Sequence, residues 1–131
     1  MFEKLSKKII KWAKDRDLLH RKNAPKQFLK FIEEVFEFRD EWLLFVHEYN
    51  KCSYGEANND PEVVELRGNM KLEMGDIFVT LIILCDQLNM DPVDCLARAY
   101  EKIKDRKGKT INGVFIKEGD LKWQIYKNKD K

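Results

Sequence analysis

Residues 73–85 read Glu-Met-Gly-Asp-Ile-Phe-Val-Thr-Leu-Ile-Ile-Leu-Cys, and this stretch constrains the fold of the chain strongly. A helix over Ile77–Leu84 is apolar nearly all round, so several of its sides must be covered. The apolar run is too short to cross a bilayer, which takes about 20 residues. A chain of 131 residues offers little cover for such a helix. We therefore expect a second copy of the chain to complete the core.

Helix-start signals and apolar periodicity predict four helices, or five if the third breaks near Gly68. Asp60-Pro61 and Asp91-Pro92 each place a capping residue before a proline that suits the first helical turn. The expected helices cover residues 2–19, 25 to about 50, 61 to about 89, and 92 to about 104 or 107.

The segments between and after these helices carry turn formers. Residues 51–61 predict a loop insertion, and Asn112-Gly113 predicts a short hairpin or extended arm within residues 110–131. With only 6 Gly and 3 Pro, a turn-rich all-β fold is excluded, and 44% hydrophobic residues argue against disorder. We expect an all-α bundle forming one domain over residues 1–131.

Cysteine usage and the N-terminal sequence indicate where the protein works. The three cysteines have no CxxC spacing, so neither a disulfide framework nor a zinc site is expected. The first residues lack the apolar segment of a secretory signal. These features predict a soluble protein of the cytoplasm.

Two pairs of carboxylates, one on each long helix, form the candidate site. Glu34 and Glu37 are three residues apart, as are Glu73 and Asp76, and this spacing puts each pair on one helix face. If the helices pack antiparallel, the four carboxylates converge. Four unpaired carboxylates cannot share a dry site, so either they are ordinary water-facing charges or a hard cation such as Mg²⁺ or Mn²⁺ holds them.

A di-iron carboxylate bundle is the main rival among metal sites. Such bundles use a Glu-x-x-His motif on two of their helices. The two histidines, His20 and His47, lie outside both acidic motifs. Iron is therefore not expected.

The two acidic motifs in this order resemble those of the MazG-like all-α nucleoside triphosphate pyrophosphohydrolases. The matching motifs are Glu33-Glu34-Val35-Phe36-Glu37 and Glu73-Met74-Gly75-Asp76, and the resemblance extends over residues 9–119. It is supported by residues 12–16, 27–30, 102–109 and 113–117. The resemblance implies a MazG-like bundle, Mg²⁺-dependent hydrolysis of an NTP or dNTP to monophosphate and pyrophosphate, nucleotide-pool house-cleaning, and a homodimer or homotetramer.

The resemblance also implies roles for individual residues. The metal ligands would be Glu34, Glu37, Glu73 and Asp76, with Glu34 or Glu37 accepting the proton of the attacking water. Glu33 would pair with a base such as Lys30 or position water. Lys102 and Arg106, four apart on one helix, would hold phosphates together with Lys109. A base-stacking aromatic is also needed, and Trp12 is either that residue or a core tryptophan.

One departure from the family pattern concerns the spacer between the motifs. It holds 35 residues between Glu37 and Glu73, more than in compact family members. The extra segment around residues 52–67 lengthens the helices, covers the pocket or changes the choice of substrate.

The distribution of charge separates the candidate partners. The net charge of +2 conceals +7 in residues 1–32, −11 in 33–94, +1 in 95–100 and +5 in 101–131. Basic ends flanking an acidic middle fit a metal–triphosphate better than nucleic acid or a membrane, neither of which we expect as a partner. The alternatives are a non-catalytic helical interaction protein and a nucleic-acid-binding protein using its lysine-rich ends.

Overall fold

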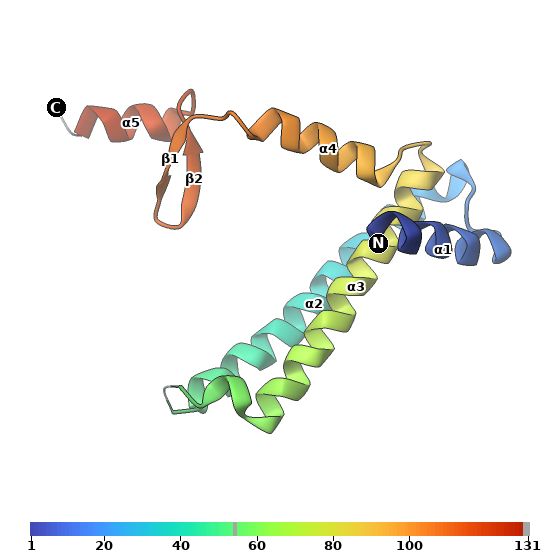
Figure 1. Cartoon of the computed structure of the whole chain (residues 1–131), viewed down its shortest axis with the longest axis horizontal. Helices are drawn as coiled ribbons and strands as arrows, with labels where there is room; N and C mark the ends of the chain where they lie inside the picture. Colours follow the sequence, from blue (N-terminus) through green and yellow to red (C-terminus); the bar gives the residue numbers. More distant parts are fainter. Residues whose placement is uncertain (54, 130–131) are drawn as a thin grey trace. The chain divides into compact units, whose positions relative to one another are not determined.

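The protein is mostly helical, as expected, in a computed structural model that describes residues 1–53 and 55–129 (Figure 1). Within them lie five helices, two short 3₁₀ turns and one antiparallel hairpin: α1 (Phe2–Asp15), η1 (Arg21–Asn23), α2 (Ala24–Lys51), η2 (Ala57–Asn59), α3 (Pro61–Gln87), α4 (Pro92–Ile103), β1 (Gly108–Ile111), β2 (Val114–Lys117) and α5 (Leu121–Lys129). These elements form two compact units, Met1–Pro92 and Val93–Lys131. Parts of the expected 51–61 loop and 110–131 arm, residues 54 and 130–131, lie outside the described residues.

Helices α2 and α3 run side by side and form the body of the first unit (Figure 1). The predicted start of α3 is confirmed, since the Asp60 side chain accepts hydrogen bonds from the amides of Glu62 and Val63, both at 3.1 Å. Helix α3 then continues through Gly68 without the break that the sequence allowed.

The long spacer between the acidic motifs is mostly helix. After Glu37, α2 continues to Lys51, and α3 begins at Pro61, well before Glu73. Each helix is therefore longer by about three to four turns than the acidic motifs require. The spacer therefore lengthens the two helices, which is one of the three roles that the sequence allowed for it.

The interior of the first unit is small. Val63, Ile82 and Ile83 of α3 are buried, as is Ala13 of α1, and α1 contacts α3. Two side-chain amides tie the elements together: Gln27 Nε2 donates to the Thr80 carbonyl at 3.3 Å, and Gln87 Nε2 donates to the Leu18 carbonyl at 2.8 Å. These bonds satisfy backbone carbonyls and hold α2 and the end of α1 against α3.

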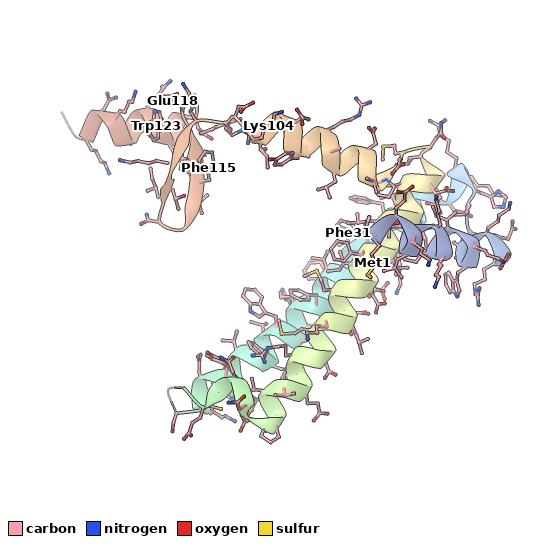
Figure 2. All side chains as sticks on the ribbon, in the orientation of Figure 1. Met1, Phe31, Lys104, Phe115, Glu118 and Trp123 are labelled. Atoms are coloured by element: carbon pink, nitrogen blue, oxygen red, sulfur yellow. The ribbon has the colours of Figure 1, made fainter. Side chains whose placement is uncertain are left out.

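Large apolar side chains remain exposed on both long helices, and they project outward from the helical hairpin that α2 and α3 form (Figure 2). Leu72 is 71% exposed and Phe36 52%, and others left at least half exposed are Phe28, Leu29, Leu43, Leu44 and Val64. Much of the apolar surface of α2 is thus uncovered in the single chain.

The second unit contains the predicted hairpin. β1 pairs with β2 in the register Ile111 to Val114, and Asn112 and Gly113 have positive φ angles of 51° and 78°, as a two-residue type I′ turn requires. Gly108 is needed at the start of β1, because a Cβ there would lie 2.1 Å from the Ile116 carbonyl oxygen. The hairpin is followed by helix α5, which the sequence analysis did not predict.

None of the helices within residues 1–53 and 55–129 combines the length and the apolar character that spanning a membrane requires.

Candidate metal centre

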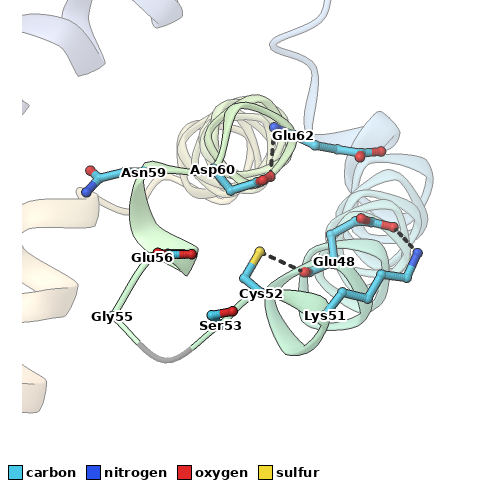
Figure 3. Close-up of a pocket in the computed structure, with 9 residues that line it drawn as sticks. All are labelled: Glu48, Lys51, Cys52, Ser53, Gly55, Glu56, Asn59, Asp60 and Glu62. Atoms are coloured by element: carbon cyan, nitrogen blue, oxygen red, sulfur yellow. Dashed lines mark hydrogen bonds and ion pairs between the residues drawn. The ribbon is translucent and has the colours of Figure 1, made fainter.

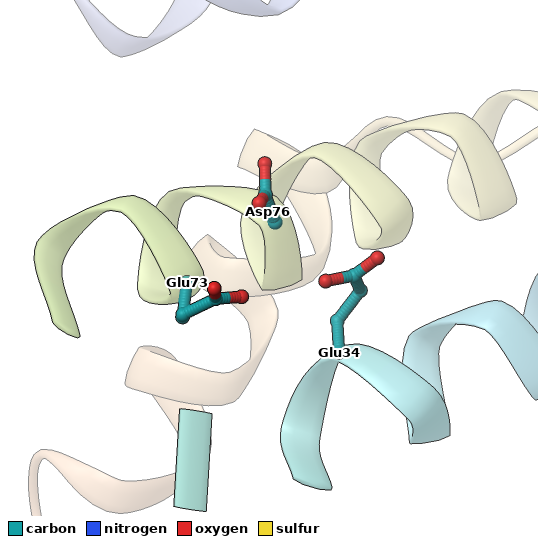
Figure 4. Close-up of side chains that lie close together, drawn as sticks. All are labelled: Glu34, Glu73 and Asp76. Carbon is teal, nitrogen blue, oxygen red and sulfur yellow. The ribbon is translucent and has the colours of Figure 1, made fainter. Parts of the chain in front are cut away.

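Three of the four predicted metal ligands converge in the first unit. Glu34 of α2 and Glu73 and Asp76 of α3 each place a carboxylate oxygen within 4.8 Å of the others, and we call this set the carboxylate cluster (Figure 4). The i, i+3 spacing of Glu73 and Asp76 and the side-by-side packing of α2 and α3 produce this convergence. The cluster spans a burial gradient from buried Glu34 to exposed Asp76.

Glu34 is the most buried member of the cluster, with a side chain only 7% exposed. Its Oε1 accepts an ion pair from Lys30 Nζ at 2.9 Å, while its Oε2 is buried and has no hydrogen-bond partner among the described residues. The bond to Lys30 lowers the pKa of Glu34, so this carboxylate stays ionised. A buried, ionised oxygen without a partner is costly, and a cation at the cluster would satisfy it.

Glu73 faces the opposite electrostatic situation. Its Oε2 is also buried and unpaired within the part of the chain that the structure describes. Burial raises the pKa of Glu73, and the neighbouring charges of Asp76 and Glu34 raise it further. The negative charges of the cluster are therefore only partly compensated, which favours binding of a positive ion.

Glu37, the fourth predicted ligand, does not belong to this close set. It is exposed, one turn after Glu34 on α2. The hydrogen bond that a protonated Glu37 donates to Glu34 raises the pKa of Glu37, as does the charge of Glu34. Glu37 therefore borders the cluster from the solvent side.

The donor set fits a hard cation. Each cluster member offers only carboxylate oxygens, which are the ligands preferred by Mg²⁺ and Mn²⁺. Since Mg²⁺ usually keeps several waters, three converging carboxylates are enough protein ligands for it. The unpartnered oxygens of Glu34 and Glu73 are the observation that distinguishes this cluster from an ordinary charged surface.

The residues predicted to bind substrate are divided between the two units. Lys30 pairs with Glu33 at 3.3 Å as well as with Glu34. Trp12, 47% exposed on α1, has the Arg16 guanidinium 4.2 Å from its ring centre, so a core role is not what the single chain shows. Lys102, Arg106 and Lys109 belong to the second unit, and their joining the carboxylates stays a prediction.

Glu41 is a neighbour of the cluster that the sequence analysis left without a role. Its Oε2 is buried and unpaired with respect to residues 1–53 and 55–129, and its charge contributes to the raised pKa of Glu73. Glu41 follows Glu34 and Glu37 by seven and four residues on α2, a spacing that returns to the same helix face. This periodicity was the signal that could have identified it.

A hollow of about 530 Å³ lies where α2 passes into α3 (Figure 3). It is far from the cluster, because the 14 residues from Glu34 to Glu48 correspond to about 21 Å of helix. Three of its charged side chains have local partners: Lys51 pairs with Glu48 at 2.9 Å and Asp60 caps α3. Burial raises the pKa of the Cys52 thiol, which disfavours a nucleophilic thiolate. This hollow is a feature of the connecting loop.

Comparisons with known proteins give one similar sequence. No family model and no solved structure matches the chain. A protein of Haemophilus phage HP1 described as an "Uncharacterized 18.2 kDa protein in rep-hol intergenic region" is 35% identical over 91 residues, which is 70% of this chain and 44% of that protein. The chain thus spans less than half the length of this relative, whose description names no activity.

Proposed function

We propose that the protein is a Mg²⁺-dependent nucleoside triphosphate pyrophosphohydrolase of the MazG-like type, which converts an NTP or dNTP to the monophosphate and pyrophosphate. The observation that carries the proposal is the convergence of Glu34, Glu73 and Asp76 within 4.8 Å, together with a buried oxygen on each of Glu34 and Glu73 that finds no partner among the residues described. The order and spacing of the two acidic motifs on adjacent helices support it.

The carboxylate cluster would hold the metal. Bound Mg²⁺, or Mn²⁺ in its place, would supply charge neutralisation at the phosphates and a lower pKa for a bound water. Glu34, buried and ionised, anchors this site from α2, and Glu73 and Asp76 complete it from α3.

Glu37 is the better of the two candidates for accepting the proton of the attacking water. Glu34 is buried and held by Lys30, so it has little room for a water molecule. Glu37 is exposed at the border of the cluster, where a water approaching from solvent would come within its reach. General-base assistance of this kind contributes about 10²–10⁴-fold to a rate.

The basic residues of the second unit would hold the phosphate chain. Helix α4 ends at Ile103, so Lys102 lies in its last turn, Arg106 follows the helix and Lys109 lies in β1. The shared helix expected for Lys102 and Arg106 is therefore not formed, but all three residues lie on one short segment. Their charges would stabilise the departing pyrophosphate by charge-assisted hydrogen bonds. Trp12 would stack on the base through its exposed indole.

A homodimer or homotetramer would cover the exposed apolar side chains of α2 and α3. Monomeric proteins rarely expose contiguous apolar patches of more than a few hundred Å². Burying such side chains yields about 25 cal/mol per Å². The partly exposed apolar residues that surround the acidic motifs, such as Phe36 and Leu72, make a second copy of the hairpin the natural cover.

A panel of NTPs and dNTPs tests the proposal. The purified protein is incubated with each nucleotide and Mg²⁺, and released pyrophosphate is measured. At least one nucleotide should be hydrolysed, and Glu37→Gln and Asp76→Asn should lower that rate about 100-fold or more. Asp40→Asn is the matched control, because Asp40 is an exposed carboxylate of α2 paired with Arg39 at 3.4 Å. Absence of pyrophosphate with every nucleotide, or unchanged rates in both variants, would refute the proposal.

A further inference from the structure

Lys30 and Glu34 form an ion pair in which the carboxylate is buried and the ammonium is half exposed. Lys30 Nζ lies 2.9 Å from Glu34 Oε1 and 3.3 Å from Glu33 Oε1. The Glu34 side chain is 7% exposed, whereas that of Lys30 is 48% exposed. The carboxylate is thus held between α2 and α3, and the ammonium reaches it from solvent on a flexible stem.

The carboxylate of Glu34 is shared between this ion pair and the cluster. Oε1 accepts from Lys30, while Oε2 is buried and unpaired within the described part of the chain. A divalent cation held with Glu73 and Asp76 would therefore lie a few Å from the Lys30 ammonium. Two positive charges that share one buried carboxylate repel each other more strongly than they would in water.

We propose that Lys30 is an exchangeable counter-ion of the carboxylate cluster: a divalent cation displaces its ammonium from Glu34, and the freed ammonium then meets the oxygens of the triphosphate. This inference rests on the proposed function and adds a competition that it does not require. Displacement is easy, because Glu33 is 57% exposed and stays within reach as an alternative partner. The charge also moves to where it is needed, since the cation and the triphosphate arrive together.

The exchange predicts that removing the Lys30 ammonium increases the affinity of the cluster for a cation. A lysine that only supports the site would, when removed, leave cation affinity unchanged or lower it. Removal of a competing counter-ion raises cation affinity. It should also weaken binding of the phosphate chain, which loses a charged partner.

The test uses Mn²⁺ titrations of the full chain, followed by electron paramagnetic resonance of free Mn²⁺. Lys30→Met should bind Mn²⁺ about three- to fivefold more tightly than the wild type, the effect expected when a half-exposed competing ion pair is lost. Lys30→Arg should stay close to the wild type. Lys26→Met is the matched control, because Lys26 is exposed one turn earlier on α2, and it should leave the affinity unchanged.

A second titration measures inorganic tripolyphosphate at saturating Mg²⁺. Here Lys30→Met should bind about tenfold more weakly, as expected for the loss of a hydrogen bond between charged groups. Lys30→Gln provides the same comparison if the methionine variant does not fold, as judged by circular dichroism.

The outcomes separate the two proposals. A wild-type protein that takes up no Mn²⁺ would overturn the metal site and with it the proposed function. A wild-type protein that binds Mn²⁺, with Lys30→Met binding equally or more weakly, would overturn the exchange alone. Tighter Mn²⁺ binding in Lys26→Met as well would reduce the effect to net charge and would also overturn it.

Discussion

Gln27 of α2 donates a hydrogen bond from Nε2 to the backbone carbonyl of Thr80 in α3 at 3.3 Å. Counting seven residues forward from Gln27 reaches Glu34, and counting seven back from Thr80 reaches Glu73. Seven residues are two helical turns. The bond and the two carboxylates therefore share one antiparallel register, and Gln27 helps to set the face on which the cluster forms.

Gln27→Ala should loosen that register. Losing a part-buried hydrogen bond and leaving the Thr80 carbonyl with one partner fewer should lower the free energy of unfolding by about 1 kcal/mol. Mn²⁺ affinity should fall as well, because the carboxylates of Glu34 and Glu73 are held less firmly in the positions that bind the ion. Urea denaturation and a Mn²⁺ titration measure the two effects, and a variant unchanged in both would show that Gln27 has no such role.

Glu73→Gln should separate two effects of the cluster on stability: the repulsion among its charges without a metal, and the stabilisation that a bound cation provides. Burial and the neighbouring charges raise the pKa of Glu73, so its negative charge is unfavourable in the folded chain. Removing it should raise the stability measured without divalent cations by about 0.2–1 kcal/mol and abolish most of the stabilisation that Mg²⁺ provides. Thermal unfolding with and without Mg²⁺ checks both, with Asp40→Asn as control. A loss of stability in the absence of Mg²⁺ would contradict the electrostatic reasoning.

Cation affinity should fall early on acidification. Glu37 and Glu73 both have pKa values above the ordinary 4.5, so protons begin to occupy them at a higher pH than usual. Protons and cations compete for the same oxygens. Mn²⁺ titrations from pH 8 to pH 5 should show weakening that begins above the range of an ordinary glutamate. An affinity that stays constant down to pH 5 would contradict this expectation.

The stability of the metal-free chain should respond to pH with two signs. Glu34 has a lowered pKa, so its contribution is present above the ordinary value of 4.5 and is lost as the pH falls through its folded pKa. Glu73 has a raised pKa. The free energy of unfolding of the chain therefore increases as the pH falls from the folded pKa of Glu73 towards 4.5. Glu37 also has a raised pKa and contributes a gain of the same sign. Urea denaturation at several pH values should therefore show that Glu73→Gln reduces the gain above pH 4.5. If that variant keeps the whole gain, Glu73 is not a source of it.

The exposed apolar side chains of the helical hairpin formed by α2 and α3 should mediate self-association. Leu72 and Phe36 are 71% and 52% exposed, and a glutamate in place of either would place a charge in the interface. Sedimentation of the wild type should show a dimer or tetramer, and Leu72→Glu should shift it towards the monomer. Lys71→Glu, at the exposed neighbouring position of α3, is a control for added negative charge. A wild type that sediments as a monomer would contradict the proposed assembly.

Much of the local structure was predictable because single residues carry strong signals. The Asp60-Pro61 start of α3 and the Asn112-Gly113 turn depend on capping and on positive φ, which are properties of those residues themselves. Helix α5 was not predicted, because Trp123 and Ile125 are two apart in the sequence, a spacing that is typical of a strand.

The candidate site was predictable only as far as helix faces define it. Spacing alone placed Glu73 and Asp76 together, and antiparallel packing brought Glu34 to them. The expected pair of Lys30 with Glu33 is present, but the shorter contact of Lys30 with Glu34 was not predicted, although both glutamates lie within reach of a helical lysine three or four residues earlier. Burial separates these two glutamates, and it depends on how α2 packs on α3.

The most direct measurement of the proposed reaction identifies the phosphorus products. The wild-type protein is incubated with Mg²⁺ and the nucleotide that responds best in the panel, and ³¹P nuclear magnetic resonance follows the products. Hydrolysis between the α- and β-phosphates should give the nucleoside monophosphate and pyrophosphate in equal amounts, and Glu73→Gln should stop their appearance. Release of nucleoside diphosphate and orthophosphate, or equal turnover by Glu73→Gln, would contradict the proposed function.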